Sequence, residues 1–267
     1  MKSYLSYFKL KFITGLQYRA AALAGMATQL FFGFVFISVY IACYNSGNNN
    51  LPMELSKLVS YLWLCQIFFS FTYVFYRDKE IINMIISGNI SYELCRPQDL
   101  YSMWWARMYG DRLSKVILRF LPILCIAVIL PNPYNLNLEI SLYRFLIFII
   151  IFILSSILIT SLSVLYHVIC IFTLDDRGII NIFMVIADIL SGSFVPVPFF
   201  PTFIQKINNY LPFRYISDFP FRFYVGDINF NECYISIIVQ IIWIFILMIT
   251  GKLLMKKALK KAVIQGG

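Results

Sequence analysis

"LYRFLIFIIIFILSSILITSLSVLYHVICIF", residues 142–172, is an apolar stretch with Arg144 near its start and His167 near its end. An α-helix of about twenty apolar residues is long enough to cross the hydrocarbon core of a bilayer. This stretch exceeds that length, and it also exceeds what a soluble helix usually buries. It therefore predicts a transmembrane helix and excludes a soluble helical core.

The rest of the chain has the same character. Hydrophobic residues make up 60% of the 267 residues and charged residues only 13%, whereas soluble domains carry roughly 25% charged residues. Further apolar runs recur, so we predict an all-α integral membrane protein with a single transmembrane domain, residues 1–267. Its six predicted spans are residues 22–44, 56–77, 113–131, 142–172, 178–198 and 234–255.

The basic residues orient these spans. The net charge is +9, and sixteen of the 22 Lys and Arg fall in segments that an even number of spans places on one side, together with both termini. The side rich in Lys and Arg is the cytoplasmic one. We therefore predict a multi-pass protein of the cell membrane with both termini in the cytoplasm, and the charge gives no reason to expect nucleic-acid binding.

The N-terminal segment is too polar to span a membrane. Its apolar residues recur at helical spacing among basic ones, which is typical of an amphipathic helix lying on the membrane surface. The alternative is a basic flank that only orients the first span. The apolar positions are Tyr4, Leu5, Phe8, Phe12 and Leu16.

A polar strip, "IISGNISYELCRPQD" at residues 85–99, lies in the cytoplasmic loop 78–112. Gly88 ends a helix that carries an isoleucine stripe, and a short element, residues 90–94, follows before Pro97. Asp99 is then a plausible N-cap for the next helix. The pattern predicts a stiff hairpin with a polar tip beyond the membrane, because a mere connector would be shorter.

The external loop, residues 199–233, is too apolar and aromatic for a free loop. Its prolines divide it into short pieces. We expect short helices that dip back into the outer leaflet and cover the bundle before the last span.

Polar side chains recur at helical spacing inside several predicted spans. They either line or gate a pathway or join helices to one another. An intramembrane carboxylate such as Asp188 usually faces a bundle interior or water. The candidate pathway-lining or gating residues are Gln66, Ser70, Ser163, His167, Asp188 and Ser191.

Several chemical motifs are missing. The sequence has no G-x-x-x-x-G-K-[ST] phosphate loop, no GxSxG, no HExxH and no C-x-x-C. We therefore expect no catalytic centre, metal site or cofactor in this chain. Of the six cysteines, Cys43 and Cys233 could both lie at the outer surface, so a disulfide between them and two free thiols remain alternatives.

These features together resemble the permease subunits of type-two ABC exporters, in the small six-span branch. The amphipathic start, "IISGNISYELCRPQD", "LSGSFVPVPFFPTFIQKINNYLPFRYISDFPFRFYVGD" and the basic ending "KKALKKAVIQGG" carry the likeness. The resemblance implies a homodimer or heterodimer of permeases with two ATPase subunits below, which bind ATP and Mg²⁺. It also implies export, in this branch often of drugs, cationic toxicants or antimicrobial peptides.

The resemblance also assigns residues. The first cytoplasmic loop would carry the element that docks in a groove of the ATPase, and the external turn at Pro212 and Phe213 would cap the pathway. The implied docking residues are Gly88, Asn89, Ile90, Tyr92, Glu93, Arg96 and Pro97.

Two other classes compete with this interpretation. An ion- or proton-coupled carrier needs several charged groups at mid-membrane, and the sequence offers mainly Asp188. A membrane-embedded enzyme needs a catalytic cluster, and none is visible.

Overall fold

The computed structural model describes residues 2–46, 51–74, 76–95, 97–137, 141–174 and 178–261. Within these ranges the chain is helical, without strands. The long helices are α1 (Lys2–Gln17), α2 (Arg19–Asn45), α3 (Leu55–Ile67), α7 (Leu100–Ile129), α8 (Leu142–Thr173), α9 (Ile179–Leu190) and α12 (Phe230–Lys261). The short ones are α4 (Phe69–Thr72), α5 (Lys79–Ile86), α6 (Ile90–Leu94), η1 (Val197–Phe199), α10 (Thr202–Asn208), η2 (Phe213–Tyr215) and α11 (Asp218–Tyr224).

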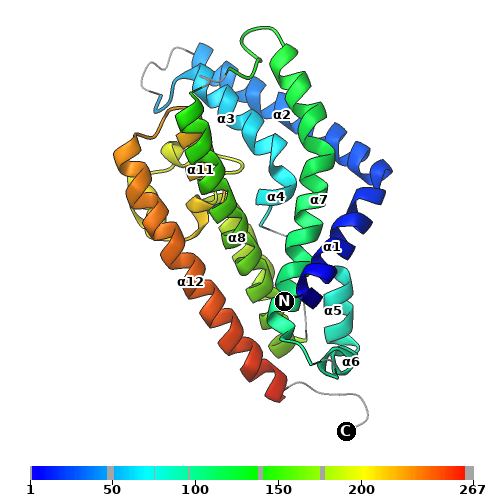
Figure 1. Cartoon of the computed structure of the whole chain (residues 1–267). Helices are drawn as coiled ribbons and strands as arrows, with labels where there is room; N and C mark the ends of the chain where they lie inside the picture. The colour runs from blue at the N-terminus through cyan, green and yellow to red at the C-terminus, as the bar shows by residue number, and fades with distance from the viewer. Residues whose placement is uncertain are drawn as a thin grey trace.

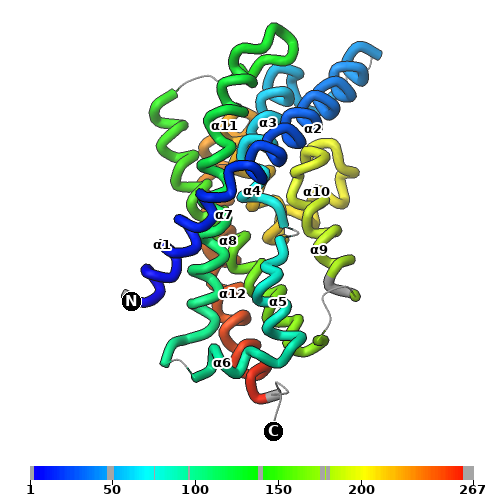
Figure 2. The backbone as a smooth tube through the Cα atoms, turned by 90° about the vertical axis from the view of Figure 1, so that its right-hand side faces the viewer, coloured from blue at the N-terminus to red at the C-terminus, as the bar shows by residue number. Residues whose placement is uncertain are grey.

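The long helices form an elongated bundle. Figure 1 shows α8 and α12 packed along each other and α1 lying along α7. The hairpin of α5 and α6 lies at one end of the bundle, whereas α10 and α11 lie in the opposite half (Figure 2). The two halves of the molecule are therefore built differently, as expected if they face different sides of a membrane.

Three described helices are long and apolar enough to cross a membrane: α2, α8 and most of α12. They correspond to the predicted spans 22–44, 142–172 and 234–255. The other three predictions need correction. The predicted span 113–131 is only the second half of the 30-residue α7, because the helix already begins at Leu100.

The predicted continuous span 56–77 is wrong, because its helix ends at Ile67 and only the single turn of α4 follows. The predicted span 178–198 is also too long, since α9 ends at Leu190 and Ser191 begins a turn. Hydropathy does not detect these endings, because the residues beyond them are as apolar as those before them.

The N-terminal helix is present, but it does more than lie on a surface. A side chain at Gly110 of α7 would place its Cβ only 2.8 Å from the carbonyl oxygen of Phe8, so the two backbones touch there. The opposite face of α1 exposes Leu5, Leu10 and Ile13. One face of α1 thus packs on the bundle, and the other is free to contact lipid.

The loop predicted to be external forms short helices, as its prolines indicate, whereas its place in the outer leaflet stays a prediction. Pro196, Pro201 and Pro212 stand at the N-caps of η1, α10 and η2. The buried Asp218 ties these pieces together, because its carboxylate accepts a 3.0 Å hydrogen bond from the Val197 amide. Tyr61 of α3 donates to the Gly192 carbonyl at 2.7 Å and anchors the preceding turn.

The cysteines form no disulfide. All six cysteines are free thiols, and Cys43 is exposed whereas Cys233 is buried. The alternative of a disulfide between these two is therefore not realised.

Candidate functional site

The site begins where α4 ends inside the bundle. Arg112 of α7 is fully buried. Its guanidinium donates to backbone carbonyl oxygens at the end of α4. Its Nη1 donates to Phe71 at 2.6 Å and to Tyr73 at 3.0 Å, while its Nη2 donates to the Ser163 hydroxyl at 2.6 Å. Unpaired backbone groups are costly inside a membrane, so Arg112 stabilises the break in the second predicted span.

Two further side chains satisfy amides of the unwound segment. Asp188 of α9 accepts from the Val74 amide at 3.5 Å, and His167 Nε2 of α8 accepts from the Asp78 amide at 3.0 Å. Because Nε2 accepts, the neutral imidazole carries its proton on Nδ1, which donates to the Ser163 carbonyl at 2.7 Å. The break is thus held from three helices: α7, α8 and α9.

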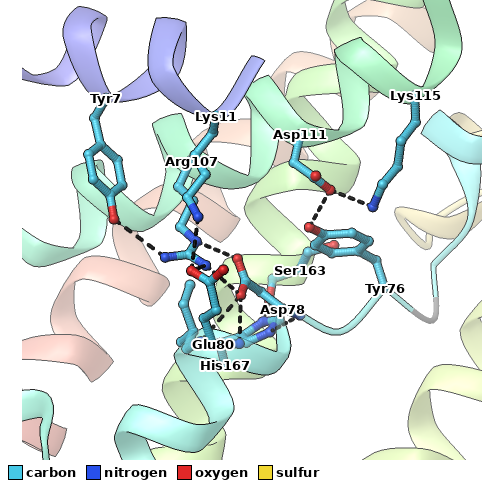
Figure 3. Close-up of polar contacts among 11 residues, drawn as sticks. Tyr7, Lys11, Tyr76, Asp78, Glu80, Arg107, Asp111, Lys115, Ser163 and His167 are labelled. Carbon is cyan, nitrogen blue, oxygen red and sulfur yellow. Dashed lines mark hydrogen bonds and ion pairs between the residues drawn. The ribbon is translucent and has the colours of Figure 1, made fainter. Parts of the chain in front are cut away.

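An ionic cluster lies around Asp78 and Glu80, where the unwound segment leads into α5 (Figure 3). Asp78 accepts from Arg107 of α7 through two bonds, at 2.5 Å from Nε and 2.8 Å from Nη2. Glu80 contacts the same guanidinium and accepts from Lys11 of α1 at 2.9 Å. The cluster therefore connects α1, α5 and α7 through charge-assisted hydrogen bonds.

The carboxylates in and beside this cluster each accept hydrogen bonds from neighbouring side chains. The hydrogen bond from Lys11 is the main cause that lowers the pKa of Glu80, although partial burial opposes it and Arg107 adds to the lowering. A third carboxylate, Asp111, accepts from the Tyr76 hydroxyl and from Lys115, both at 2.6 Å (Figure 3). Glu80 and Asp111 are thus both held by internal partners.

Asp78 also starts the hairpin. Its carboxylate accepts from the amides of Glu80 at 3.0 Å and Ile81 at 3.2 Å, which makes it the N-cap of α5. A side chain that caps a helix and pairs with a buried arginine fixes the helix start to the bundle. The base of the hairpin is therefore stiff.

The turn and the short element of the hairpin form where the sequence predicts them, and its position beyond the membrane stays a prediction. Gly88 adopts φ +73° after α5, and α6 covers residues 90–94. Asp99 caps α7 by accepting from the Ser102 amide at 3.0 Å, and its own amide donates to Tyr4 of α1 at 2.9 Å. The isoleucine stripe is buried at Ile81, Ile82 and Ile85 and exposed at Ile86.

The predicted docking residues differ in how far they are exposed. Gly88 and Ile90 are buried and shape the turn, whereas Glu93 is half-buried. Asn89, Tyr92 and Pro97 are exposed at the tip. Arg96 lies outside the described residues.

Of the predicted pathway residues, Ser163, His167 and Asp188 surround the break, as described above. Ser191 donates to the Asp188 carbonyl at 2.6 Å, which fixes the end of α9. Ser70 accepts from Arg119 at 2.9 Å, and Gln66 lines an aromatic cavity of about 240 Å³. The structure thus brings four of the six together at the break and its flank.

A scan against protein families matches the model of the "ABC-2 family transporter protein" over residues 26–266, which is nearly the whole chain. The chain belongs to the ABC-2 transporter family. A search of curated proteins gave no match. Membership makes the chain a membrane subunit of an ABC transporter, a class that works with ATPase subunits and is generally not catalytic itself.

Within this ABC-2 subunit, the sequence analysis missed the residues at the centre of the site. Arg107 and Arg112 counted only among the basic residues that orient the spans, and Asp78 had no assigned role. The available signal was an arginine, Arg112, at the very edge of a predicted span, where burial is costly without partners. Its partners are mostly backbone carbonyls of a broken helix, which no spacing pattern reveals.

Proposed function

We propose that this chain is the membrane subunit of an ATP-driven exporter and that the α5–α6 hairpin docks a separate ATPase subunit. The observation that carries the proposal is the contrast along the hairpin. Its tip exposes Tyr92, Leu94 and Asn89 at the end of the molecule, whereas its base is fixed by the buried pair of Asp78 and Arg107. An exposed aromatic on a rigid element is the kind of anchor that protein interfaces use.

The same contacts suggest how motion is transmitted. Closure of an ATPase pair would displace the hairpin, and Asp78 would carry this displacement to Arg107 of α7 and to the unwound residues above. Lys11 would move α1 with it through Glu80. Rigid elements around a break respond as a lever, so the break at residue 73 is the proposed pivot.

The proposed assembly contains two permeases, either identical copies or homologous partners, above two ATPase subunits that bind ATP and Mg²⁺. In the cell membrane the chain would cross six times, with α3–α4, α7 and α9 as the three crossings that hydropathy alone does not establish. Both termini and the hairpin would then be cytoplasmic, and α10 and α11, with Pro212 and Phe213 at the turn between them, would cap the external end.

The proposed cargo is a drug, a cationic toxicant or a peptide. The aromatic cavity between α2, α4 and the turn after α9 suits such a molecule. Its walls carry Phe32, Phe36, Phe69 and Phe194, with Gln66 as a polar contact. Aromatic faces attract organic cations through their ring quadrupoles. Stimulation of ATP hydrolysis by candidate substrates would identify the cargo.

The docking proposal is tested at Tyr92. The side chain is 74% exposed, so Tyr92→Ala should leave the fold intact and remove an anchor for the ATPase. Truncation of an aromatic interface anchor costs about 2 kcal/mol, roughly a thirtyfold loss of affinity. The measurement is co-purification of the cognate ATPase subunit, together with substrate export.

Tyr210 provides the matched control. It is 79% exposed in the half of the bundle proposed to be external, so Tyr210→Ala should recover the ATPase as the unchanged chain does. Equal recovery of the ATPase by both variants would contradict the docking assignment.

A further inference from the structure

A cavity of about 430 Å³ with both charged and apolar walls lies beside the junction of α1 and α2. Tyr18 and Ala21 line it from the junction, Lys79 from α5, and Lys115 and Arg119 from α7. A neighbouring cavity of about 190 Å³ shares Tyr18, Lys79 and Lys115 with it. These two cavities share no lining residue with the aromatic cavity or with the tip of the docking hairpin.

The acidic residues in the walls are already engaged. Glu80 is held by Lys11 and Arg107, and Asp111 by Tyr76 and Lys115. They are therefore internal partners of the fold and leave little negative charge to repel an anion.

Basic groups in the walls are less completely engaged. Lys79 is exposed, and within the described part of the chain its ammonium makes no hydrogen bond or ion pair. Arg119 donates from Nη1 to Ser70, but its buried Nε has no hydrogen-bond partner among the residues that the structure describes. Lys115 is half-exposed beside Asp111, so its ammonium has donors to spare. The cavity thus offers a surplus of cationic donors.

The cavity lies at the boundary of the apolar zone. The membrane-spanning helix α2 begins at Arg19, directly after the lining residue Tyr18, which is itself exposed. Leu118 supplies an apolar wall, and Leu23 of α2 is exposed one turn further along. Cationic donors therefore lie next to exposed apolar surface. A phospholipid could place its headgroup on the donors and its acyl chains on the apolar surface.

We propose that this cavity binds the headgroup phosphate of an anionic phospholipid, with Lys79 and Lys115 as the phosphate contacts and Tyr18 at the membrane interface. Basic pockets between membrane helices are suited to anionic headgroups. The bound lipid would brace the corner formed by α1, α2, α5 and α7. Its assignment to the cytoplasmic leaflet rests on the proposed orientation, whereas the site itself does not depend on export or on ATPase docking.

The test uses the purified full chain in a neutral detergent. We expect dioleoyl-phosphatidylglycerol to raise the thermal unfolding midpoint, and dioleoyl-phosphatidylcholine and inorganic phosphate to leave it nearly unchanged. Lys79→Gln and Lys115→Gln should each weaken phosphatidylglycerol binding about fivefold, the value of one basic residue near an anionic lipid. The apparent affinity comes from titrating the lipid.

Lys256→Gln is the matched control. Lys256 is exposed near the end of α12, outside the cavity, and the substitution removes the same charge. Its phosphatidylglycerol affinity should equal that of the unchanged chain. Equal weakening in all three variants would show unspecific attraction, and a midpoint shift from inorganic phosphate alone would show a soluble-anion site. Either result would overturn the proposal.

Discussion

Arg112 holds the break in the helix at the end of α4. It is fully buried, yet its partners are two backbone carbonyls and a hydroxyl, and no carboxylate among the described residues is bonded to it. A guanidinium suits this position because it presents several donors in a fixed plane. The guanidinium thus donates hydrogen bonds to carbonyl oxygens of the broken helix.

Replacing this side chain should therefore destabilise the chain. Arg112→Gln keeps a polar group but is too short to reach both carbonyls and Ser163. Loss of a buried, charge-assisted set of bonds typically costs about 3 kcal/mol. We expect a clearly lower thermal unfolding midpoint in detergent, whereas Arg19→Gln, at an exposed arginine, should not change it. Equal midpoints would show that the break is held by other contacts.

At the scale of elements, the hairpin depends on one backbone conformation. Gly88 adopts φ +73°, a region that costs other residues about 1 kcal/mol or more. Gly88→Ala should therefore loosen α6 and raise its amide hydrogen exchange about fivefold. Ser87→Ala, in the same turn but with ordinary φ −80°, should leave exchange in α6 nearly unchanged. If both variants exchange alike, Gly88 does not control the hairpin.

The elements also show what the sequence can predict. The short element 90–94 and the cap at Asp99 were correctly predicted, because turn residues and caps are local signals. The long apolar helix α8 begins at the predicted residue and extends one residue beyond the predicted end.

The second and fifth spans were not correctly bounded. Their endings are stabilised by side chains distant in sequence, such as Arg112 at the end of α4 and Asn208, whose amide nitrogen donates to the Leu190 carbonyl at the end of α9. The candidate site could be predicted only where it is local. Gly88 and Ile90 follow from turn chemistry, but the pairing of Asp78 with Arg107 spans 29 positions and depends on how α5 meets α7.

At the scale of the whole molecule, each end of the bundle carries an exposed cysteine that a thiol reagent can label. Cys43 is exposed near the end of α2 and Cys95 is exposed after α6, at the opposite end of the bundle (Figure 1). Cys125 is exposed on α7 within the apolar zone. Buried thiols at Cys65, Cys170 and Cys233 should not react with a bulky reagent in the folded protein.

These thiols test the proposed orientation directly. In single-cysteine variants, a membrane-impermeant maleimide should label Cys43 in intact cells and Cys95 only after the membrane is permeabilised. Cys125 is the control: it should stay unlabelled in both conditions because lipid covers it and keeps a membrane-impermeant reagent away. Labelling of Cys95 in intact cells would place the hairpin outside, where no ATPase could dock, and would contradict both the orientation and the proposed exporter mechanism.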